Sequence, residues 1–366
     1  MRESFLKMLN GEIPNKIVWT ADIFYWIAGR KMAGQADTQW ESELGYLKLC
    51  RELGIMPYYW YEKFWLGVPR YSNVDFTEDC SIPAKRISRW ETPVGKLFSE
   101  TLFVSESCSE ACVKYPVENE KDLKTLLYLL EHRQLVPDCV DDYQKRLNLW
   151  AEYDGIPSIA MPRSPLSGFF YEWAGLQNGI YMLMDFPEIV KEILRLMEQQ
   201  ESPIMDAVCK LSPPVVHFAD NLSSENFVSL FDSFMLEPYK RRLNRLHAAG
   251  VKCAVHLDGT VKGLLPRLAD VGFDAIEALT PKPAGDITVE EMRSLTKNKN
   301  VILWGGMPGA MFAEPFTWNE IKKHIEDLIE AWNGTRFVIG VADQVPANGN
   351  IEFVKKISKF LKVAGK

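Results

Sequence analysis

The chain has 366 residues, of which 47% are hydrophobic and 25% are charged, and its formal net charge is −7 at pH 7. These proportions are typical of a folded protein with a large core, whereas an acidic chain without a lysine and arginine cluster argues against nucleic acid or an anionic membrane surface as partner. A small molecule is therefore the expected partner, and the length suits a single α/β barrel with insertions as well as two or three average domains.

Residues 1–116 predict a helical extension, the first strands and an insertion. In chain order, the patterns indicate a helix over 2–9, a strand over 16–19, a helix over 42–53, and a strand with its following loop over 57–65. The last of these, PYYWYEKFW, is the stretch densest in aromatic residues, which suit a half-buried strand. Residues 86–116 then alternate apolar and polar side chains with period two around a Thr-Pro-Val-Gly tip, which predicts an inserted β-hairpin.

From residue 119 onward, helices and short apolar strands alternate. Helices are predicted over 119–132 and 141–153, then strands over 158–161, 215–219, 252–255, 274–278, 301–304 and 337–340, with helices between them that include 261–269 and 318–332 and a final helix from residue 351. The strands are nearly continuously apolar, as expected of parallel strands covered on both faces. About eight strands, most of them followed by a helix, predict one α/β domain over residues 1–366, a (β/α)8 TIM barrel with an N-terminal helical extension and an inserted β-hairpin.

The N-terminal segment and the cysteines indicate a cytoplasmic protein. The opening MRESFLKMLNGEIP carries charges throughout and lacks the apolar centre of a secretory signal, and no apolar run approaches the roughly 18 residues that a membrane span requires. The cysteines are scattered and include no CxxC pair, which is typical of reduced thiols. They are Cys50, Cys80, Cys108, Cys112, Cys139, Cys209 and Cys253.

Polar residues follow several strands at the point where each strand leaves the predicted sheet. The carboxyl ends of parallel strands meet at one rim, where α/β barrels keep their chemistry, so we expect these groups to converge on one site. In chain order they are Asp220, Asn221, His256, Asp258, Glu277 and Asp343.

Each of these residues also has a plain structural interpretation. A core imidazole that bonds a backbone carbonyl would explain His256, and a helix cap or turn would explain Asp220 and Asn221. An ion pair would explain Glu277 or Arg163. The aromatic stretch over 57–65 is explained by core packing or, at the mouth of a barrel, by a cage for a methylated ammonium or a flat ligand.

Several segments resemble the uroporphyrinogen decarboxylase superfamily, which includes corrinoid-dependent methyltransferases. They are RESFLKMLNGEIPNKIVW at the start, TPVGKL, RSPL over 163–166, FADNLSSENFVSLFDSFMLEPYKRRLNRLHAAG, HLDG, and GVADQVPANGNI near the end. The resemblance follows the whole chain in order. It implies a (β/α)8 barrel whose active site lies at the carboxyl ends of the strands.

The chain departs from the decarboxylase branch of that superfamily. True decarboxylases carry an arginine-containing motif after the first strand and a catalytic aspartate after the second. Here Gly29 and Arg30 echo the first motif only in part, and the segment after the second strand offers Glu62 but no aspartate. The resemblance therefore favours the methyltransferase branch.

The chain also departs from the zinc motif of the methyltransferases. Those enzymes bind zinc through a histidine, a cysteine two residues later and a second cysteine near the last strand. The histidine matches His256, but Asp258 stands at the first cysteine position and Ala342 or Asp343 at the second. Zinc accepts carboxylate oxygens, so the resemblance implies a divalent metal held by His256, Asp258, Glu277 and Asp343.

These observations give a set of expected site residues. The same carboxylates and imidazole could instead act directly on the substrate as acid and base. The residues expected to be catalytic are His256, Asp220 and Asp343. The residues expected to bind substrate are Asn221, Arg163, Tyr59 and Trp304.

Three functions are compatible with the sequence. The first is a cytoplasmic methyltransferase-like enzyme that acts on a small methylated substrate and passes the methyl group to a thiol or to a corrinoid carried by a partner protein. The second is a decarboxylase of uroporphyrinogen or another carboxylic acid, with Arg30 or Arg163 on the carboxylates. The third is a barrel that binds a small ligand without catalysis. A homodimer is compatible with each of them.

Overall fold

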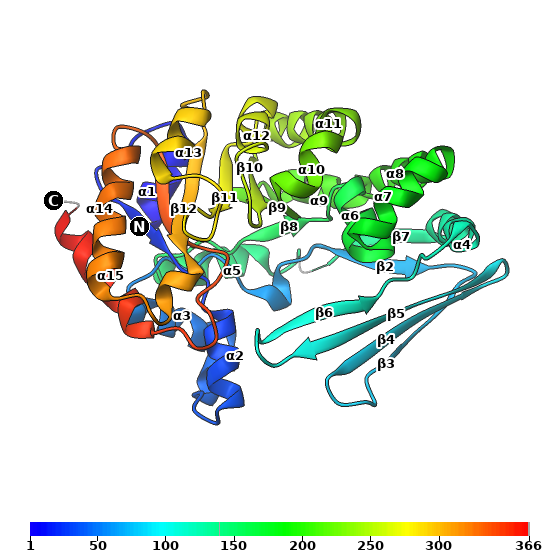
Figure 1. Ribbon diagram of the computed structural model, residues 1–366, viewed down its shortest axis with the longest axis horizontal. Helices are drawn as coiled ribbons and strands as arrows, with labels where there is room; N and C mark the ends of the chain where they lie inside the picture. Colours follow the sequence, from blue (N-terminus) through cyan, green and yellow to red (C-terminus); the bar gives the residue numbers. More distant parts are fainter. Residues whose placement is uncertain (139, 365–366) are drawn as a thin grey trace.

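The computed structural model describes residues 1–138 and 140–364; Cys139 lies outside the described residues. Within those residues, seven parallel strands form one curved sheet (Figure 1). In the order in which they neighbour one another, they are β1 (Val18–Thr20), β13 (Phe337–Ala342), β12 (Ile302–Pro308), β11 (Ala275–Leu279), β10 (Lys252–Leu257), β9 (Val215–Leu222) and β8 (Ile159–Met161).

An extended segment over residues 55–60 joins the two edges of this sheet. The amide of Met56 donates to the carbonyl of Trp19 in β1 at 2.9 Å, and the amide of Ser158, next to β8, donates to the carbonyl of Tyr58 at 2.8 Å. Further along, Trp65 forms a parallel bridge with Ala160 of β8. This segment takes the place of an eighth strand and closes the ring, so the predicted TIM barrel is confirmed.

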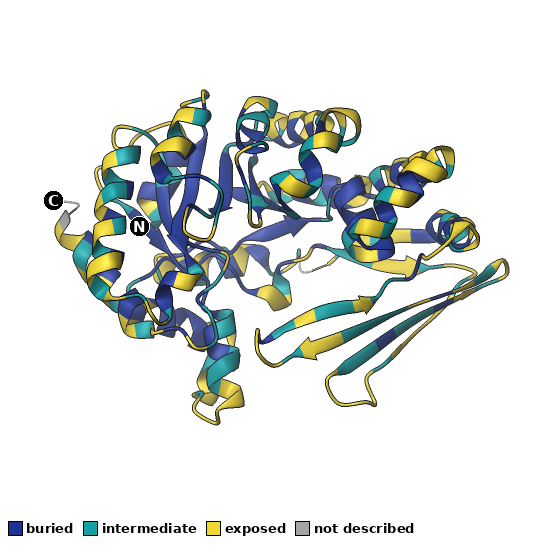
Figure 2. Ribbon diagram, in the orientation of Figure 1, coloured by how far each residue is buried: buried dark blue, intermediate teal, exposed yellow. Residues whose placement is uncertain are grey.

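Helices surround the barrel, with buried faces toward the strands and exposed faces outward (Figure 2). None of the described helices is long and apolar enough to cross a membrane. In chain order they are α1 (Arg2–Leu9), α2 (Phe24–Met32), α3 (Glu43–Leu53), α4 (Glu120–Glu131), α5 (Tyr143–Glu152), α6 (Pro165–Gly168), α7 (Leu176–Asp185), α8 (Pro187–Gln200), α9 (Ser202–Leu211), α10 (Ser224–Leu230), α11 (Leu236–Ala248), α12 (Leu265–Val271), α13 (Val289–Leu295), α14 (Trp318–Trp332) and α15 (Ile351–Ala364).

Helix boundaries follow the local signals in the sequence. The side chain of Ser42 accepts a hydrogen bond from the amide of Gly45 and begins α3, and Gly54 ends that helix with φ of 73°. A capping box of Thr317 and Glu320 begins α14. The predicted ranges 2–9 and 318–332 coincide with α1 and α14.

Helix α1 closes the amino-terminal end of the barrel. Its buried side chains Phe5, Met8 and Leu9 belong to the same apolar cluster as Val338 and Trp304 inside the ring, and the rings of Phe5 and Trp304 lie 5.0 Å apart. The barrel interior is therefore packed from below. This leaves the carboxyl ends of the strands as the open end.

The predicted hairpin is confirmed, but it is part of a larger sheet. In the described part of the chain, β3 (Asp75–Asp79), β4 (Lys85–Thr92), β5 (Gly95–Val104) and β6 (Ser109–Lys114) form an antiparallel sheet of four strands. A separate antiparallel pair, β2 (Gly67–Tyr71) and β7 (Arg133–Pro137), leads into and out of this insertion. Figure 1 shows the inserted sheet projecting from the barrel below α6, α7 and α4.

Candidate functional site

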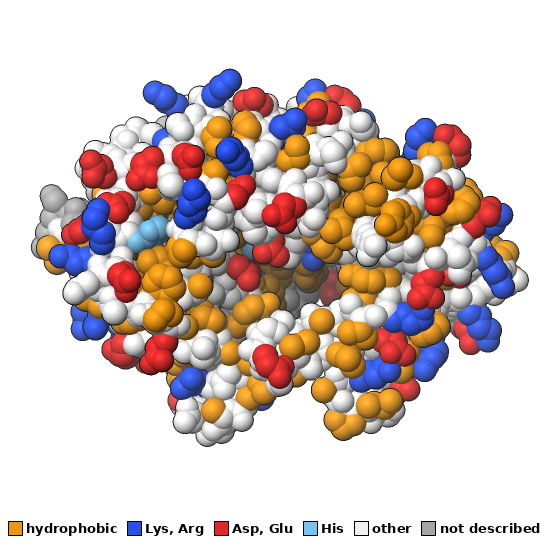
Figure 3. All heavy atoms as spheres, viewed as in Figure 1, with side chains coloured by type: hydrophobic (Ala, Val, Ile, Leu, Met, Phe, Trp, Pro, Cys, Tyr) orange, Lys and Arg blue, Asp and Glu red, His pale blue; other side chains and the backbone are white. Residues whose placement is uncertain are grey.

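A cavity of about 620 Å³ lies at the open end of the barrel; we call it the mouth cavity. Its volume is within the usual range for small-molecule sites. In Figure 3 the surface is hollowed where the barrel meets the inserted sheet. Aromatic rings make up much of the wall, namely Phe24, Tyr25, Tyr59, Tyr61, Phe64 and Trp65. The polar groups in the wall include Arg163, Asn221, His256, Asp343 and Gln344.

His256 forms a close ion pair with Glu277 at the floor of the mouth cavity. The two residues are register partners in β10 and β11, so their side chains lie on the same face of adjacent strands. Nδ1 of His256 lies 2.5 Å from Oε2 of Glu277. Because Nδ1 is bonded to Glu277, Nε2 is the ring nitrogen that remains available to a ligand in the mouth cavity, which His256 lines.

Two tyrosines complete the surroundings of the Glu277 carboxylate. The hydroxyl of Tyr58 donates to Oε1 at 3.3 Å, and the hydroxyl of Tyr59 donates to Oε2 at 3.2 Å. Only 1% of the Glu277 side chain is exposed. Both oxygens are therefore occupied by protein donors, which fits a group that positions His256.

The pair holds a proton at neutral pH. Burial alone would lower the pKa of His256, but the charge and the hydrogen bond of Glu277, with smaller contributions from Asp343 and Asp258, raise this pKa to about 9. For Glu277, burial would raise the pKa, but the attraction of His256 outweighs it and the pKa falls below its usual value. His256 is therefore an imidazolium that can donate a proton from Nε2.

His217 lies beneath this pair and is neutral. Burial lowers its pKa to about 4. The hydroxyl of Tyr59 lies 3.3 Å from its Nδ1, and the hydroxyl of Ser158 lies 3.1 Å from its Nε2. His217 thus supports Tyr59 from below, as expected for a core histidine on the inward face of β9.

Asp22 was not among the residues singled out from the sequence, yet it lies next to the mouth cavity. It follows β1, is fully buried, and accepts hydrogen bonds from the hydroxyl of Tyr61 at 2.5 Å and the amide of Phe24 at 3.0 Å. Burial raises its pKa to about 7. A signal was present, because the same dipeptide, Ala-Asp, stands where the chain leaves each of the neighbouring strands β1 and β13, at Asp22 and Asp343.

Asp343, Asn221 and Tyr59 line the mouth cavity as expected. Asp343 has a left-handed backbone with φ of 60°, and burial raises the pKa of its carboxyl group. Asn221 is also left-handed, with φ of 51°. Non-glycine residues in this region are strained and gather at functional sites, which agrees with a site at this rim.

Arg163 also lines the cavity, but its guanidinium is engaged by the protein. It donates to the carbonyl of Ala219 and, at 3.1 Å, to Oδ1 of Asn221. It also lies over the rings of Trp65 and Tyr171, at 5.6 and 5.4 Å from their centroids. Arg163 therefore shapes the wall more than it offers free donors to a substrate.

Of the residues expected to be catalytic or to bind substrate, two lie outside the mouth cavity. Asp220 is fully buried on the outer face of β9, where its carboxylate accepts hydrogen bonds from the amide of Ser164 at 2.6 Å and the hydroxyl of Tyr239 at 2.5 Å. Trp304 is 1% exposed in the barrel interior and donates to the hydroxyl of Thr20 at 2.8 Å. The catalytic assignment of Asp220 and the substrate-binding assignment of Trp304 are corrected to structural roles.

The four expected metal ligands are not assembled as a metal centre. Glu277 accepts hydrogen bonds from His256 and two tyrosines, whereas Asp258 is exposed in the loop after β10. Within the described ranges, no three of His256, Asp258, Glu277 and Asp343 place ligating atoms within 4.8 Å of one another. This arrangement therefore differs from a zinc centre, in which three or four ligating atoms converge on one point.

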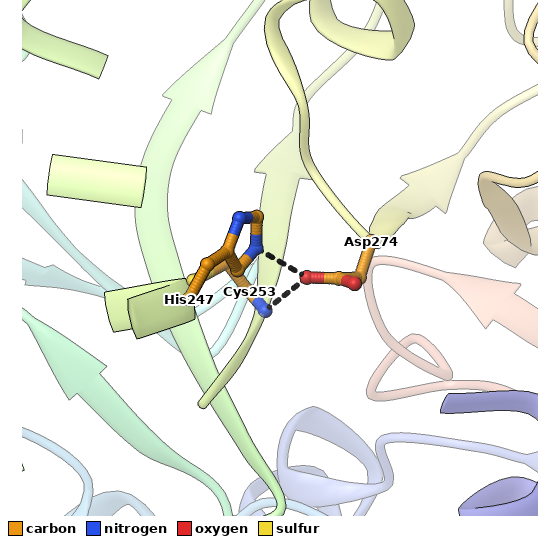
Figure 4. Close-up of side chains that lie close together, drawn as sticks. All are labelled: His247, Cys253 and Asp274. Atoms are coloured by element: carbon orange, nitrogen blue, oxygen red, sulfur yellow. Dashed lines mark hydrogen bonds and ion pairs between the residues drawn. The ribbon is translucent and has the colours of Figure 1, made fainter. Parts of the chain in front are cut away.

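One other group of ligand-type side chains lies at the opposite end of the barrel. It contains His247, Cys253 and Asp274, shown in Figure 4. Oδ2 of Asp274 accepts from Nε2 of His247 at 2.8 Å and from the amide of Cys253 at 2.9 Å, and Lys252 lies 3.2 Å from Oδ1. Burial raises the pKa of the Cys253 thiol well above its usual value. The contact of His247 with Asp274 fastens α11 to the sheet, and Lys252 forms an ion pair with the same carboxylate.

Comparisons with known proteins agree with this architecture. The sequence model of uroporphyrinogen decarboxylase (URO-D) matches residues 113–363. No curated protein gives a significant match. A solved methyltransferase from Methanosarcina mazei is similar with a TM-score of 0.63 and 12% identity, over 100% of this chain and 99% of that one. A B12-independent methionine synthase from Shewanella sp. W3-18-1, solved with selenomethionine, has a TM-score of 0.52 and 10% identity, over 95% and 98% of the two chains. At such identities these two structures show a shared fold.

Proposed function

The chain belongs to the uroporphyrinogen decarboxylase family, and from this premise we propose that it is a methyltransferase-like enzyme that removes a methyl group from a heteroatom of a small molecule. The mouth cavity is the proposed substrate site. The observation that carries the proposal is the His256–Glu277 pair, because it presents a proton donor to an aromatic cavity of suitable size.

The proposed step needs an acid. A nucleophile attacks the methyl carbon, the bond between that carbon and the substrate oxygen breaks with its electron pair left on oxygen, and Nε2 of His256 delivers a proton to that oxygen. The products are the demethylated alcohol or phenol, the methylated acceptor and a neutral His256. General acid catalysis of this kind typically contributes about 10²-fold to 10⁴-fold in rate.

This chemistry favours a methyl ether over a quaternary ammonium compound. An ammonium group leaves as a neutral amine and needs no proton, whereas an ether oxygen leaves as an anion unless it is protonated. The aromatic wall around Tyr59 and Tyr61 suits a flat or apolar body next to the methoxy group. The acceptor that we propose is a thiol or a corrinoid held by a partner protein, which would approach through the open mouth.

A polyanionic substrate is less well supported. Arg163 is the arginine in the wall of the mouth cavity, and its guanidinium is already bound to the protein. Glu110 and Asp343 also line the wall and would repel carboxylates. Decarboxylation of uroporphyrinogen, the second function compatible with the sequence, therefore has less support than methyl transfer.

The test is a methyl-transfer assay with the purified protein, a panel of methoxylated and quaternary ammonium compounds, and either free cob(I)alamin or a thiol as acceptor. We expect methylated acceptor to form from methoxylated compounds, and His256→Gln to lower the rate by at least about 100-fold. His247→Gln is the matched control, since His247 lies at the other end of the barrel. Equal rates for the two variants, or turnover restricted to ammonium compounds, would contradict the proposal.

A further inference from the structure

A second cavity, of about 330 Å³, lies between the barrel and the inserted sheet. Strands β2 and β7 supply part of its wall, and β4 and the helical segment over 169–174 supply aromatic rings. Three rings of its wall are those of Tyr71 in β2, Trp90 in β4 and Trp173 in the helical segment. The proposed function uses none of these groups, so we call this space the insertion cavity and treat it separately.

The insertion cavity contains a buried arginine that is not part of an ion pair. Arg133 is only 8% exposed. Its Nε donates to the neutral Oε1 of Gln200 at 2.8 Å, and Gln200 is itself oriented by a hydrogen bond to the carbonyl of Leu130. None of the ion pairs among residues 1–138 and 140–364 includes Arg133. A buried cation without an anionic partner is unfavourable unless something else compensates the charge.

Other charges around the insertion cavity do not supply that partner. Glu201 lines it but is bound to Arg242 at 2.7 Å. Glu172 lines it as well, and its closest cation is Arg163, with Nε at 3.8 Å from Oε1. The ion pairs at this wall are Arg242 with Glu201 and Arg163 with Glu172, and neither carboxylate lies within ion-pair distance of Arg133.

A second polar group of this wall is also unsatisfied. Nε1 of Trp173 is buried and has no hydrogen-bond partner among the residues that the structure describes. Trp173 is 4% exposed, and the guanidinium of Arg133 lies 5.7 Å from its ring centroid. Buried donors are almost always paired, so an unpaired indole donor next to a guanidinium without an anionic partner leaves room for an acceptor at this wall.

We propose that the insertion cavity binds a small monocarboxylate with a flat apolar body, whose carboxylate accepts from Arg133 and Trp173 while its body lies among the rings of Tyr71 and Trp90. A carboxylate matches the geometry of a guanidinium, and flat rings stack well on aromatic walls. Trp65 and Arg163 line this cavity and the mouth cavity alike, so the ligand lies beside the proposed substrate site. The inference does not depend on methyl transfer.

The test is isothermal titration calorimetry of the full chain with benzoate, phenylacetate and indole-3-carboxylate, each compared with its uncharged amide. We expect at least one acid to bind more tightly than its amide. Arg133→Gln should weaken that acid by roughly 10-fold to 100-fold, because a hydrogen bond to a charged group is lost. The control Arg195→Gln removes an exposed arginine of α8 outside this cavity and should leave the affinity unchanged.

A second, milder variant keeps the test informative if Arg133→Gln fails to fold. Trp173→Phe keeps the ring and removes only Nε1, so the affinity for the acid should fall by about 2-fold to 10-fold and the affinity for the amide should not change. His256→Gln should lower turnover by at least about 100-fold and leave binding of the acid intact, which separates this site from the proposed function. The inference is overturned when no acid binds more tightly than its amide, or when neither cavity variant differs from Arg195→Gln.

Discussion

Replacing Glu277 by glutamine should convert His256 from an imidazolium into a neutral imidazole at neutral pH. The substitution keeps the shape of the side chain but removes the charge that outweighs the effect of burial on His256. Burial then dominates, and it lowers the pKa of a histidine. His217 shows the outcome in the same barrel, because its partners are hydroxyl groups and its pKa is about 4.

The size of the effect follows from the difference between a pKa of about 9 and the ordinary value of 6.5. This difference corresponds to about 3 kcal/mol of interaction with the protonated ring. Because the folded pKa is the higher one, the stabilisation is complete below pH 6.5 and is lost as the pH rises through 9. At pH 8 about nine tenths of His256 is protonated in the parent protein, and no more than about 3% in the variant.

Two measurements check this prediction. Nitrogen NMR of histidine-labelled protein should show His256 titrating near pH 9 in the parent chain and below 6.5 in Glu277→Gln, with the signal assigned through His256→Gln. Methyl transfer at pH 8 should fall by at least about 30-fold and recover partly toward pH 5. Tyr58→Phe, which removes a neutral donor at 3.3 Å, should cause a much smaller change. A ring in Glu277→Gln that still titrates above pH 8 would refute the reasoning.

Three further predictions concern the surroundings of the site. Asp22 has a pKa raised from 3.8 to about 7, so its contribution to stability is lost as the pH rises from about 4 through 7. Asp22→Asn should therefore be more stable than the parent by up to roughly 4 kcal/mol at pH 8 and by less than half of that at pH 5, with the difference vanishing toward pH 3, measured by urea unfolding. Asp220→Ala removes two buried acceptors and should lower the free energy of unfolding by about 3 kcal/mol, with the turnover per folded molecule unchanged. Dialysis against EDTA should leave methyl transfer unchanged, with elemental analysis as the check; a loss of rate that zinc restores would instead support the metal site expected from the family resemblance.

The sequence predicts most strands and helices because the spacing of its apolar residues and the positions of glycine and proline indicate the same elements. The predicted strand over 252–255 is the first part of β10, and that over 337–340 the first part of β13. The predictions end early because strand-end residues are polar or glycine, as in β12, which continues past Gly305 and Gly306 to Pro308. Gly305 has φ of 134°, and a Cβ there would meet the amide of Leu279 at 2.6 Å. The backbone needs glycine at this position for close packing, not for a turn.

Which strand-end side chains meet in the cavity was only partly predictable. Alternation along β9 places His217 and Ala219 inside the ring, so Asp220 must point outward, and this signal was available. In β10 and β11 the register shifts beside His256 and after Ile276, and Ala278 is left-handed with φ of 61°. Such irregularities re-aim side chains and leave no trace in the hydrophobic pattern.

The role of Glu277 depends on contacts that no motif contains. Its partner His256 is fixed by the register of two adjacent strands, and its other partners, Tyr58 and Tyr59, come from an extended segment that the sequence marks only as aromatic. Both oxygens of Glu277 accept hydrogen bonds from these protein groups, so the carboxylate is fixed in orientation beside His256. The resemblance places Asp258 and either Ala342 or Asp343 where the methyltransferases carry zinc-binding cysteines. In this chain the buried carboxylate of Glu277 holds Nδ1 of His256, and that pairing keeps the ring in the protonated state that the proposed general acid needs.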